Sequence, residues 1–209
     1  ILSNVREPYS IENYLSEDDI GELIDVWESS DNKEYKNTGP ITSKIENFDN
    51  PALSKIRDLI YFGDEVEDRK VHPNIDIWYA MFFYVDAPHI IHMDDRIDTL
   101  TQIYKAFNFP LKCYHESLQF AELPRSMCVY EYSNVIHKTT NLFDKEINKH
   151  YLNHISDDWL KGLSYNSAHK WKPGNAIVFD SCRLHCGSDF REIGIKSKLG
   201  ISIFTQHSD

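Results

Sequence analysis

The sequence lacks an excess of basic residues and any long apolar run. Its 33 acidic residues outnumber the 22 basic ones, which gives a formal net charge of -11. Such a charge disfavours nucleic acid backbones and anionic membrane surfaces as partners. No apolar stretch reaches the length of a membrane span, and no signal peptide is visible in a chain that begins at Ile1. We therefore expect a protein that binds neither nucleic acid nor membranes.

Cysteines are also too few for a disulfide scaffold, because there are four in 209 residues. Cys182, His185 and Cys186 lie close together in the sequence, as zinc ligands do. Their spacing is not that of a zinc ribbon or finger, however, and no second cysteine pair follows. We interpret the cysteines as buried, reduced thiols and expect a cytoplasmic location.

The composition is that of a packed globular protein. Hydrophobic residues make up 41% and aromatic residues 13% of the chain, which excludes extensive disorder. The length predicts a single domain over residues 1–209. We expect an N-terminal helical support over residues 1–70 and a β core over residues 71–209. A helical insertion is expected at about 141–163.

Two helix starts are well marked. Ser16, followed by the acidic residues 17–19, predicts a capped helix with its charges favourably placed in the first turn. Asn50 and Pro51 predict a second helix that extends to about Phe62. Residues 95–107 look helical or irregular, and Ser156 is a candidate cap for a short helix through Leu160.

Alternating or apolar runs predict the strands. The clearest run is aromatic, covers residues 75–84, and ends at a turn that contains Pro88. Further strands are expected at residues 117–122, 126–132, 176–179 and 198–206.

The segment after the aromatic strand contains the pair His92-x-Asp94. Side chains two residues apart on an extended segment face the same side, so an imidazole and a carboxylate are aimed at one point. His185, which follows the strand at 176–179, offers a second imidazole. Two histidines and one carboxylate form the facial triad that holds non-haem Fe(II) with positions left open. His89 would face the other way on a regular strand, so we interpret it as a turn residue.

Several motifs together resemble the Fe(II)/2-oxoglutarate-dependent dioxygenases. They are Tyr84 with His92-x-Asp94, Trp171-x-Pro-Gly-Asn-Ala-Ile-Val-Phe-Asp, His185-Cys-Gly, and a final strand that opens with Lys198. The region from Tyr9 onward also looks like the first strand and helix of prolyl-hydroxylase-type members. The resemblance, to prolyl-hydroxylase-like and phytanoyl-CoA-dioxygenase-like proteins, covers most of the chain and is weakest over residues 95–170.

The resemblance implies a mainly β fold, a double-stranded β-helix (a jelly roll of the cupin type) with helices outside. His92, Asp94 and His185 would be the catalytic ligands of Fe(II), and 2-oxoglutarate and O₂ would be cosubstrates. The implied reaction is hydroxylation of a C–H bond with release of succinate and CO₂. Its substrate would be a small molecule or a side chain of a protein or peptide.

The resemblance also implies a cation for the distal carboxylate of 2-oxoglutarate, taken from the strand after the second histidine. Lys198 is the first choice, because it shares a face with Gly200 and Ser202, whose small side chains would leave room beside the ammonium. Lys196 is the second choice and Arg191 the third. The family more often uses arginine, which binds a carboxylate through two parallel hydrogen bonds.

Two further contacts are expected. Tyr84 matches a strand tyrosine that donates a hydrogen bond to the cosubstrate in some members. Arg183 shares a face with His185, where it would meet either a substrate anion or an internal carboxylate. Trp171 is more often a core residue than a substrate platform.

Two other functions stay open at this point. One is a cupin-like metal enzyme that does not use 2-oxoglutarate, which would not need Lys198. The other is a non-catalytic jelly-roll binding protein. The sequence names neither the substrate nor the oligomeric state.

Overall fold

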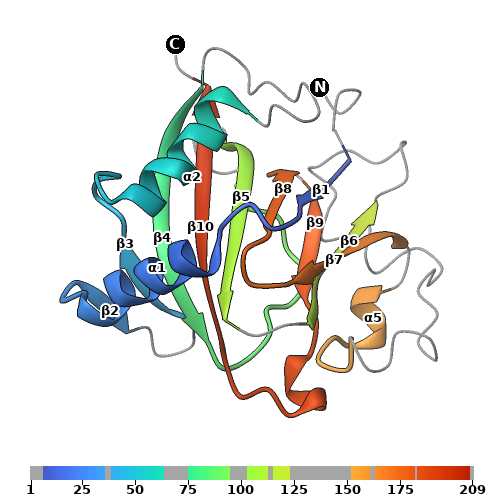
Figure 1. The fold of residues 1–209 in the computed structure, drawn as a ribbon. Helices are drawn as coiled ribbons and strands as arrows, with labels where there is room; N and C mark the ends of the chain where they lie inside the picture. Colours follow the sequence, from blue (N-terminus) through green and yellow to red (C-terminus); the bar gives the residue numbers. More distant parts are fainter. Residues whose placement is uncertain are drawn as a thin grey trace.

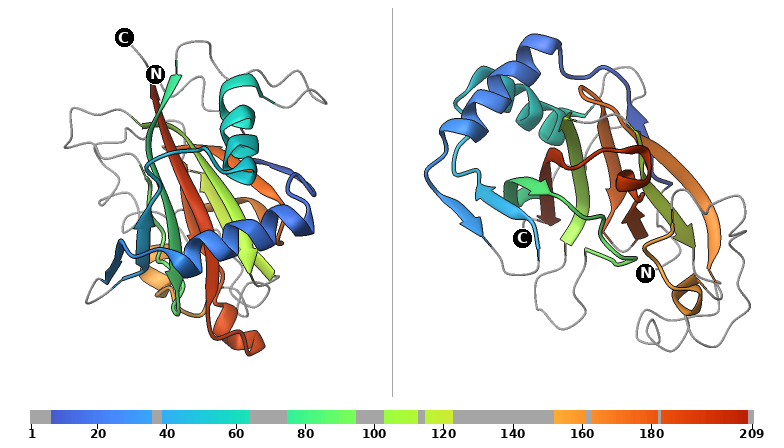
Figure 2. Two further views of the ribbon diagram at one scale, coloured as in Figure 1. Left: turned by 60° about the vertical axis from the view of Figure 1, so that its left-hand side comes forward. Right: turned by 90° about the horizontal axis from the view of Figure 1, so that it is seen from below.

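The computed structural model describes most of the chain, namely residues 7–35, 39–63, 75–94, 103–112, 115–122, 152–160, 163–181 and 183–207. Within these ranges two antiparallel sheets lie side by side, with two longer helices over one of them (Figures 1 and 2). None of the described helices is long and apolar enough to cross a membrane.

The N-terminal part supplies strands as well as helices. Its elements are β1 (Tyr9–Ile11), α1 (Glu17–Ser29), β2 (Lys33–Tyr35), β3 (Ile41–Lys44) and α2 (Pro51–Phe62). The Ser16 side chain accepts from the backbone N–H of Asp19 and the Asp19 carboxylate accepts from the N–H of Ser16, which closes a capping box. Asn50 caps α2 through the N–H groups of its first turn. Both predicted helix starts are confirmed.

The remaining elements are mostly strands. They are β4 (Ile75–Val85), β5 (Ile103–Lys112), β6 (His115–Glu122), α5 (Asp157–Leu160), β7 (Ser164–Trp171), β8 (Ala176–Asp180), β9 (Leu184–Gly187), the 3₁₀ turn η3 (Phe190–Ile193) and β10 (Lys198–His207).

These bounds confirm the strands predicted at 75–84, 117–122, 176–179 and 198–206, and the short helix through Leu160. The expectation of helical or irregular structure up to residue 107 is wrong from Ile103 onward, where β5 begins. Lys105, Asn108 and Pro110 interrupt the apolar residues of β5, so its sequence does not read as a regular strand. The strand expected at 126–132, and the helical pattern expected before residue 152, lie outside the described residues.

The larger sheet has the strand order β1-β8-β5-β10-β4-β3-β2, and the smaller sheet the order β7-β6-β9. All pairings are antiparallel. β1 forms one edge of the larger sheet, and β2 and β3 extend its other edge. The first 70 residues therefore contribute three strands to the larger sheet, in addition to the two helices that cover it. The architecture is the predicted jelly roll, mainly β with outer helices.

The side chains form layers. Helices α1 and α2 cover one face of the larger sheet (Figure 2), and the core between them includes Leu23, Ile56, Phe82, Phe107 and Ile201. On the other face a second cluster joins the two sheets. In it Phe83 of β4 meets Trp171 of β7 edge-on, with ring centroids 5.6 Å apart. The space between the two sheets therefore holds both apolar packing and the cavity described next.

Candidate metal centre and its cavity

His92, Asp94 and His185 come together at the edge of the smaller sheet, where His92 forms a bridge to His185 of β9. The backbone N–H of His92 donates to the carbonyl oxygen of His185, and that of His185 to the carbonyl of His92, both at 3.0 Å. The N–H of Asp94 bonds to the carbonyl of Ser181 at 3.1 Å. This short bridge sets the two imidazoles 4.4 Å apart between ring centroids. One ligand atom from each of the three side chains lies within 4.8 Å of the others.

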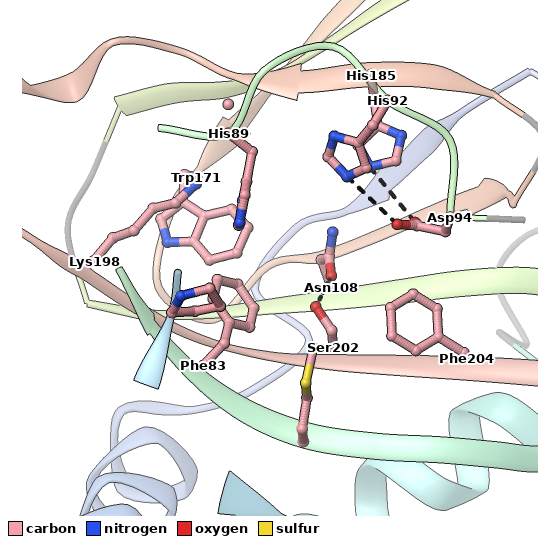
Figure 3. Close-up of a pocket in the computed structure, with 13 residues that line it drawn as sticks. Phe83, His89, His92, Asp94, Asn108, Trp171, His185, Lys198, Ser202 and Phe204 are labelled. Atoms are coloured by element: carbon pink, nitrogen blue, oxygen red, sulfur yellow. Dashed lines mark hydrogen bonds and ion pairs between the residues drawn. The ribbon is translucent and has the colours of Figure 1, made fainter. Parts of the chain in front are cut away.

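Backbone carbonyls determine which nitrogen of each ring carries the proton. Nδ1 of His92 lies 2.7 Å from the carbonyl oxygen of Ile90, and Nδ1 of His185 lies 2.9 Å from that of Arg183. A carbonyl only accepts, so each Nδ1 donates and each Nε2 offers a lone pair. Each Nε2 lies 3.5 Å from a carboxylate oxygen of Asp94 (Figure 3). Two imidazole nitrogens and a carboxylate oxygen are a donor set that fits Fe(II).

Burial and charge act together on these groups. Burial lowers the pKa of His185 to about 4, so its imidazole is neutral near pH 7, as a metal ligand must be. Burial alone would raise the pKa of Asp94, but the neighbouring histidines outweigh it and the pKa is lowered. Burial alone would lower the pKa of His92, yet the hydrogen bond and charge of Asp94 raise it. The carboxylate of Asp94 thus favours a positive charge beside it, which a metal ion bound by the neutral His185 would supply.

A cavity of about 190 Å³ adjoins the triad (Figure 3). Its wall consists of Pro40, Met81, Phe83, His89, His92, Asp94, Asn108, Trp171, His185, Gly187, Lys198, Ser202 and Phe204. Pockets for drug-sized ligands usually measure about 300–1,000 Å³. This cavity therefore has room for a ligand smaller than those.

Lys198 is the predicted cation that reaches this cavity. It opens β10, is only 4% exposed, and holds its ammonium 4.2 Å from the centroid of the Trp171 ring. Such a contact between a cation and an aromatic face is favourable. Lys196 is exposed, and Arg191 bonds to the carboxylate of Asp189 at 2.8 Å. Neither of these two lines the cavity.

The small residues beside Lys198 have a different effect from the one expected. A Cβ atom at Gly200 would lie 2.5 Å from the Trp171 ring, so the indole fills the room that was predicted for a ligand. Trp171 is fully buried and forms part of the cavity wall, so it is a core residue and a wall residue at once. Ser202 does line the cavity, where its hydroxyl donates to Oδ1 of Asn108 at 2.6 Å.

Tyr84, for which a contact with a cosubstrate was predicted, is not among the residues that line the cavity. Met81 and Phe83 of β4 line the cavity, so strand alternation directs Tyr84 to the opposite face. There its ring stacks on Trp27 of α1, with centroids 6.5 Å apart and planes 12° apart.

Arg183 is likewise absent from the cavity wall. It is buried, and its guanidinium donates to the carboxylate of Glu7 at 3.1 Å. Of the two expectations for Arg183, the structure supports the carboxylate contact and not the substrate contact.

Cys186 packs in a separate cluster with Leu160 of α5 and Leu184 of β9. Burial raises the pKa of its thiol to about 12. This free, buried thiol fits the interpretation of the cysteines as reduced. Cys113, Cys128 and Cys182 lie outside the described residues.

Sequence reasoning missed His89 and Asn108. His89 was expected to face away, but the segment before His92 is not a regular strand, and the His89 ring lies 5.6 Å from that of His92 in the cavity wall. Its carbonyl oxygen accepts from Nε2 of His154 at 3.0 Å. Asn108 did carry a signal, since it is a polar residue between two buried phenylalanines.

No protein-family model and no curated protein matches the sequence. Solved structures do match the fold. A non-heme alpha-ketoglutarate-dependent carbocyclase from nogalamycin biosynthesis, SnoK, has a TM-score of 0.60 at 10% identity, over 97% of this chain and 80% of its own. A prolyl-4-hydroxylase from Pseudomonas putida has a TM-score of 0.55 at 11% identity, over 100% and 96%.

The collagen prolyl hydroxylase of Paramecium bursaria Chlorella virus-1, solved with 2-oxoglutarate, has a TM-score of 0.51 at 12% identity, over 98% of this chain and 97% of its own. Identities this low establish the fold and not the reaction. The fold is that of the 2-oxoglutarate/Fe(II) oxygenases, as the sequence motifs implied.

Proposed function

We propose that the protein is an Fe(II)- and 2-oxoglutarate-dependent oxygenase. Its reaction is hydroxylation of a C–H bond in a small molecule or in a side chain of a peptide or protein, with release of succinate and CO₂. One observation carries the proposal: the triad His92, Asp94, His185 and the buried Lys198 line the same small cavity. The fold shared with oxygenases of this class supports it.

The triad would hold the iron. His92, Asp94 and His185 offer two nitrogens and a carboxylate oxygen, a set that leaves open positions on Fe(II) for further ligands. Bound Fe(II) would supply the chemistry that couples O₂ and 2-oxoglutarate to oxidation of the substrate. The carbonyls of Ile90 and Arg183 keep the two rings in the ligating tautomer.

Lys198 would bind the distal carboxylate of 2-oxoglutarate. An ammonium shielded from bulk water attracts an anion more strongly than one at the surface. The Trp171 ring holds the ammonium at the cavity wall, and the Ser202 hydroxyl lies on the same face of β10. Phe83, Trp171 and Phe204 form apolar walls that would limit access of water to the reacting atoms. A metal enzyme that does not use 2-oxoglutarate would have no need of this cation.

Substrate screening tests the proposed reaction. The Fe(II) protein is incubated in air with 2-oxoglutarate and a panel of metabolites and peptides, and succinate and product masses are measured. We expect at least one compound to stimulate succinate formation and to gain one oxygen atom. A product that has lost two hydrogens would contradict hydroxylation but keep the oxygenase class. Substrate oxidation without succinate would contradict the use of 2-oxoglutarate.

A further inference from the structure

Asn108 and Ser202 form a buried polar pair inside the cavity. They lie directly opposite each other on the paired strands β5 and β10. Both residues are buried, with 8% of their surface exposed. The Ser202 hydroxyl donates to Oδ1 of Asn108 at 2.6 Å. Both members of this pair line the cavity beside the triad.

The bond to Ser202 fixes the direction of the amide. Because Oδ1 accepts from the hydroxyl, the amide nitrogen is turned away from Ser202. Figure 3 shows this nitrogen pointing toward the triad, with Lys198 on the opposite side of the cavity. The structure gives the nitrogen no hydrogen bond to any of the described residues. Asn108 lines the cavity, so an N–H group without a protein acceptor there is available to an oxygen atom of a cavity ligand.

We propose that Asn108, held by Ser202, donates a hydrogen bond to the 2-oxo-acid end of the bound cosubstrate. This inference rests on the proposed function. Lys198 would then bind the distal carboxylate, and Asn108 would orient the carboxylate and keto group that approach the metal. The two residues act at opposite ends of one ligand. In this proposal the amide of Asn108 on β5 donates the hydrogen bond that was expected from Tyr84 on β4.

A hydrogen-bond donor, and not another carboxylate, is favoured at this point for an electrostatic reason. Asp94 already places a carboxylate beside the cavity, and the ligand would bring another. An aspartate at position 108 would keep both the volume and the acceptor for Ser202, but it would present an oxygen where the amide presents N–H. Asn108→Asp therefore separates the two roles. In the folded variant, normal affinity for the ligand would mean that Asn108 only accepts from Ser202, whereas a ligand-binding Asn108 predicts a loss of affinity.

The test is an anaerobic titration of the Fe(II) protein with two ligands, 2-oxoglutarate and 2-oxopentanoate. The second ligand keeps the 2-oxo acid and lacks the distal carboxylate. The visible charge-transfer band of a chelated 2-oxo acid reports binding, and iron content is measured separately. We expect Asn108→Ala to weaken both ligands by about ten- to a hundredfold, the range of a hydrogen bond to a charged group. Asn108→Asp should weaken both at least as much, and Ser202→Ala less than Asn108→Ala.

Thr205→Val is the matched control. Thr205 is buried on β10 and its hydroxyl bonds to the backbone of Lys105 on β5, so the variant removes one hydroxyl from the same two strands away from the cavity wall. Its affinity for both ligands should equal that of the unmodified protein. Thermal unfolding establishes that every variant is folded.

Three results would overturn the inference. Normal binding by Asn108→Asp would show that the amide only accepts from Ser202. A loss confined to 2-oxoglutarate in Asn108→Ala would place the hydrogen bond at the distal carboxylate. If the unmodified protein bound iron but gave no band with either acid, the proposed function itself would fail, and the inference with it.

Discussion

The two faces of the larger sheet differ in chemistry, although the same strands supply both. Along β10, Leu199, Ile201 and Ile203 pack in the core beneath the helices, whereas Lys198 and Ser202 line the cavity. Strand alternation makes this division, because neighbouring side chains point to opposite faces. One strand can therefore contribute stability on one face and ligand binding on the other.

The two faces also differ in what burial does. Apolar side chains under the helices are stabilised by leaving water, at about 25 cal/mol per Å² of apolar surface. An ammonium or a hydroxyl at the cavity wall gains nothing by burial unless it finds a partner. Substitutions on the helix face should therefore change stability, and substitutions on the cavity face should change binding.

The largest expected effect is on metal binding. We predict that His92→Ala or His185→Ala abolishes stoichiometric Fe(II) binding, because one of three ligands is lost from a site that keeps open positions. The thermal unfolding transition should remain cooperative, since the larger apolar cluster lies on the other face of the sheet. Iron content after desalting is the measurement, with the unmodified protein treated in parallel. A variant that still held one tightly bound iron would refute the assigned triad.

The next effect is on the helix face. Ile56 of α2 is fully buried in the core against the larger sheet. Ile56→Ala should lower the free energy of unfolding by about 2–5 kcal/mol, through lost apolar contacts and a cavity. Denaturant unfolding gives the change. Affinity for Fe(II) and 2-oxoglutarate, measured well below the unfolding midpoint, should not change. A large loss of affinity would contradict the separation of the two faces.

Lys198 gives the matching test on the cavity face. Lys198→Met should raise the apparent constant for 2-oxoglutarate by about ten- to a hundredfold, the range of a charge-assisted hydrogen bond. Iron binding should change little. Lys196→Met is the control, because Lys196 is exposed two residues before the strand. A larger rise in the apparent constant for Lys196→Met than for Lys198→Met would make Lys196 the residue that binds the distal carboxylate. If neither variant changed the constant, the assignment of 2-oxoglutarate as cosubstrate would be contradicted.

The smallest effect concerns a helix start far from the cavity. The Asn50 side chain accepts from the backbone N–H groups of Ala52 and Leu53. Asn50→Ala should lower the free energy of unfolding by about 1 kcal/mol, the usual loss for an N-cap. Asn47→Ala is the control, since that side chain bonds only within an exposed loop. Equal transition temperatures for the two variants would argue against the cap.

The sequence predicted best what depends on neighbouring residues. The helix starts at Ser16 and Asn50 follow from caps within a few positions, and both are present. The common direction of His92 and Asp94 follows from their spacing of two. The placement of His185 beside them needed the family resemblance, because residues 92 and 185 meet only through a bridge between distant segments.

What the sequence did not predict depends on pairings between distant segments. Tyr84 and Phe83 are adjacent and both aromatic, and only the packing of α1 against β4 decides which one faces the helices. The Asn108 side chain acquires its partner Ser202, which lies 94 residues later in the sequence, only when β5 pairs with β10. Arg183 finds its carboxylate 176 residues earlier, at Glu7. Local periodicity contains no information on such contacts.

The most direct test of the central claim is an anaerobic titration of the unmodified protein with Fe(II) and then 2-oxoglutarate. The triad and Lys198 share one cavity, so the account predicts that one equivalent of each binds. It also predicts a visible charge-transfer band that appears only when both are present, and succinate in place of 2-oxoglutarate should give no band. Tight iron binding with no band at saturating 2-oxoglutarate would contradict the claim.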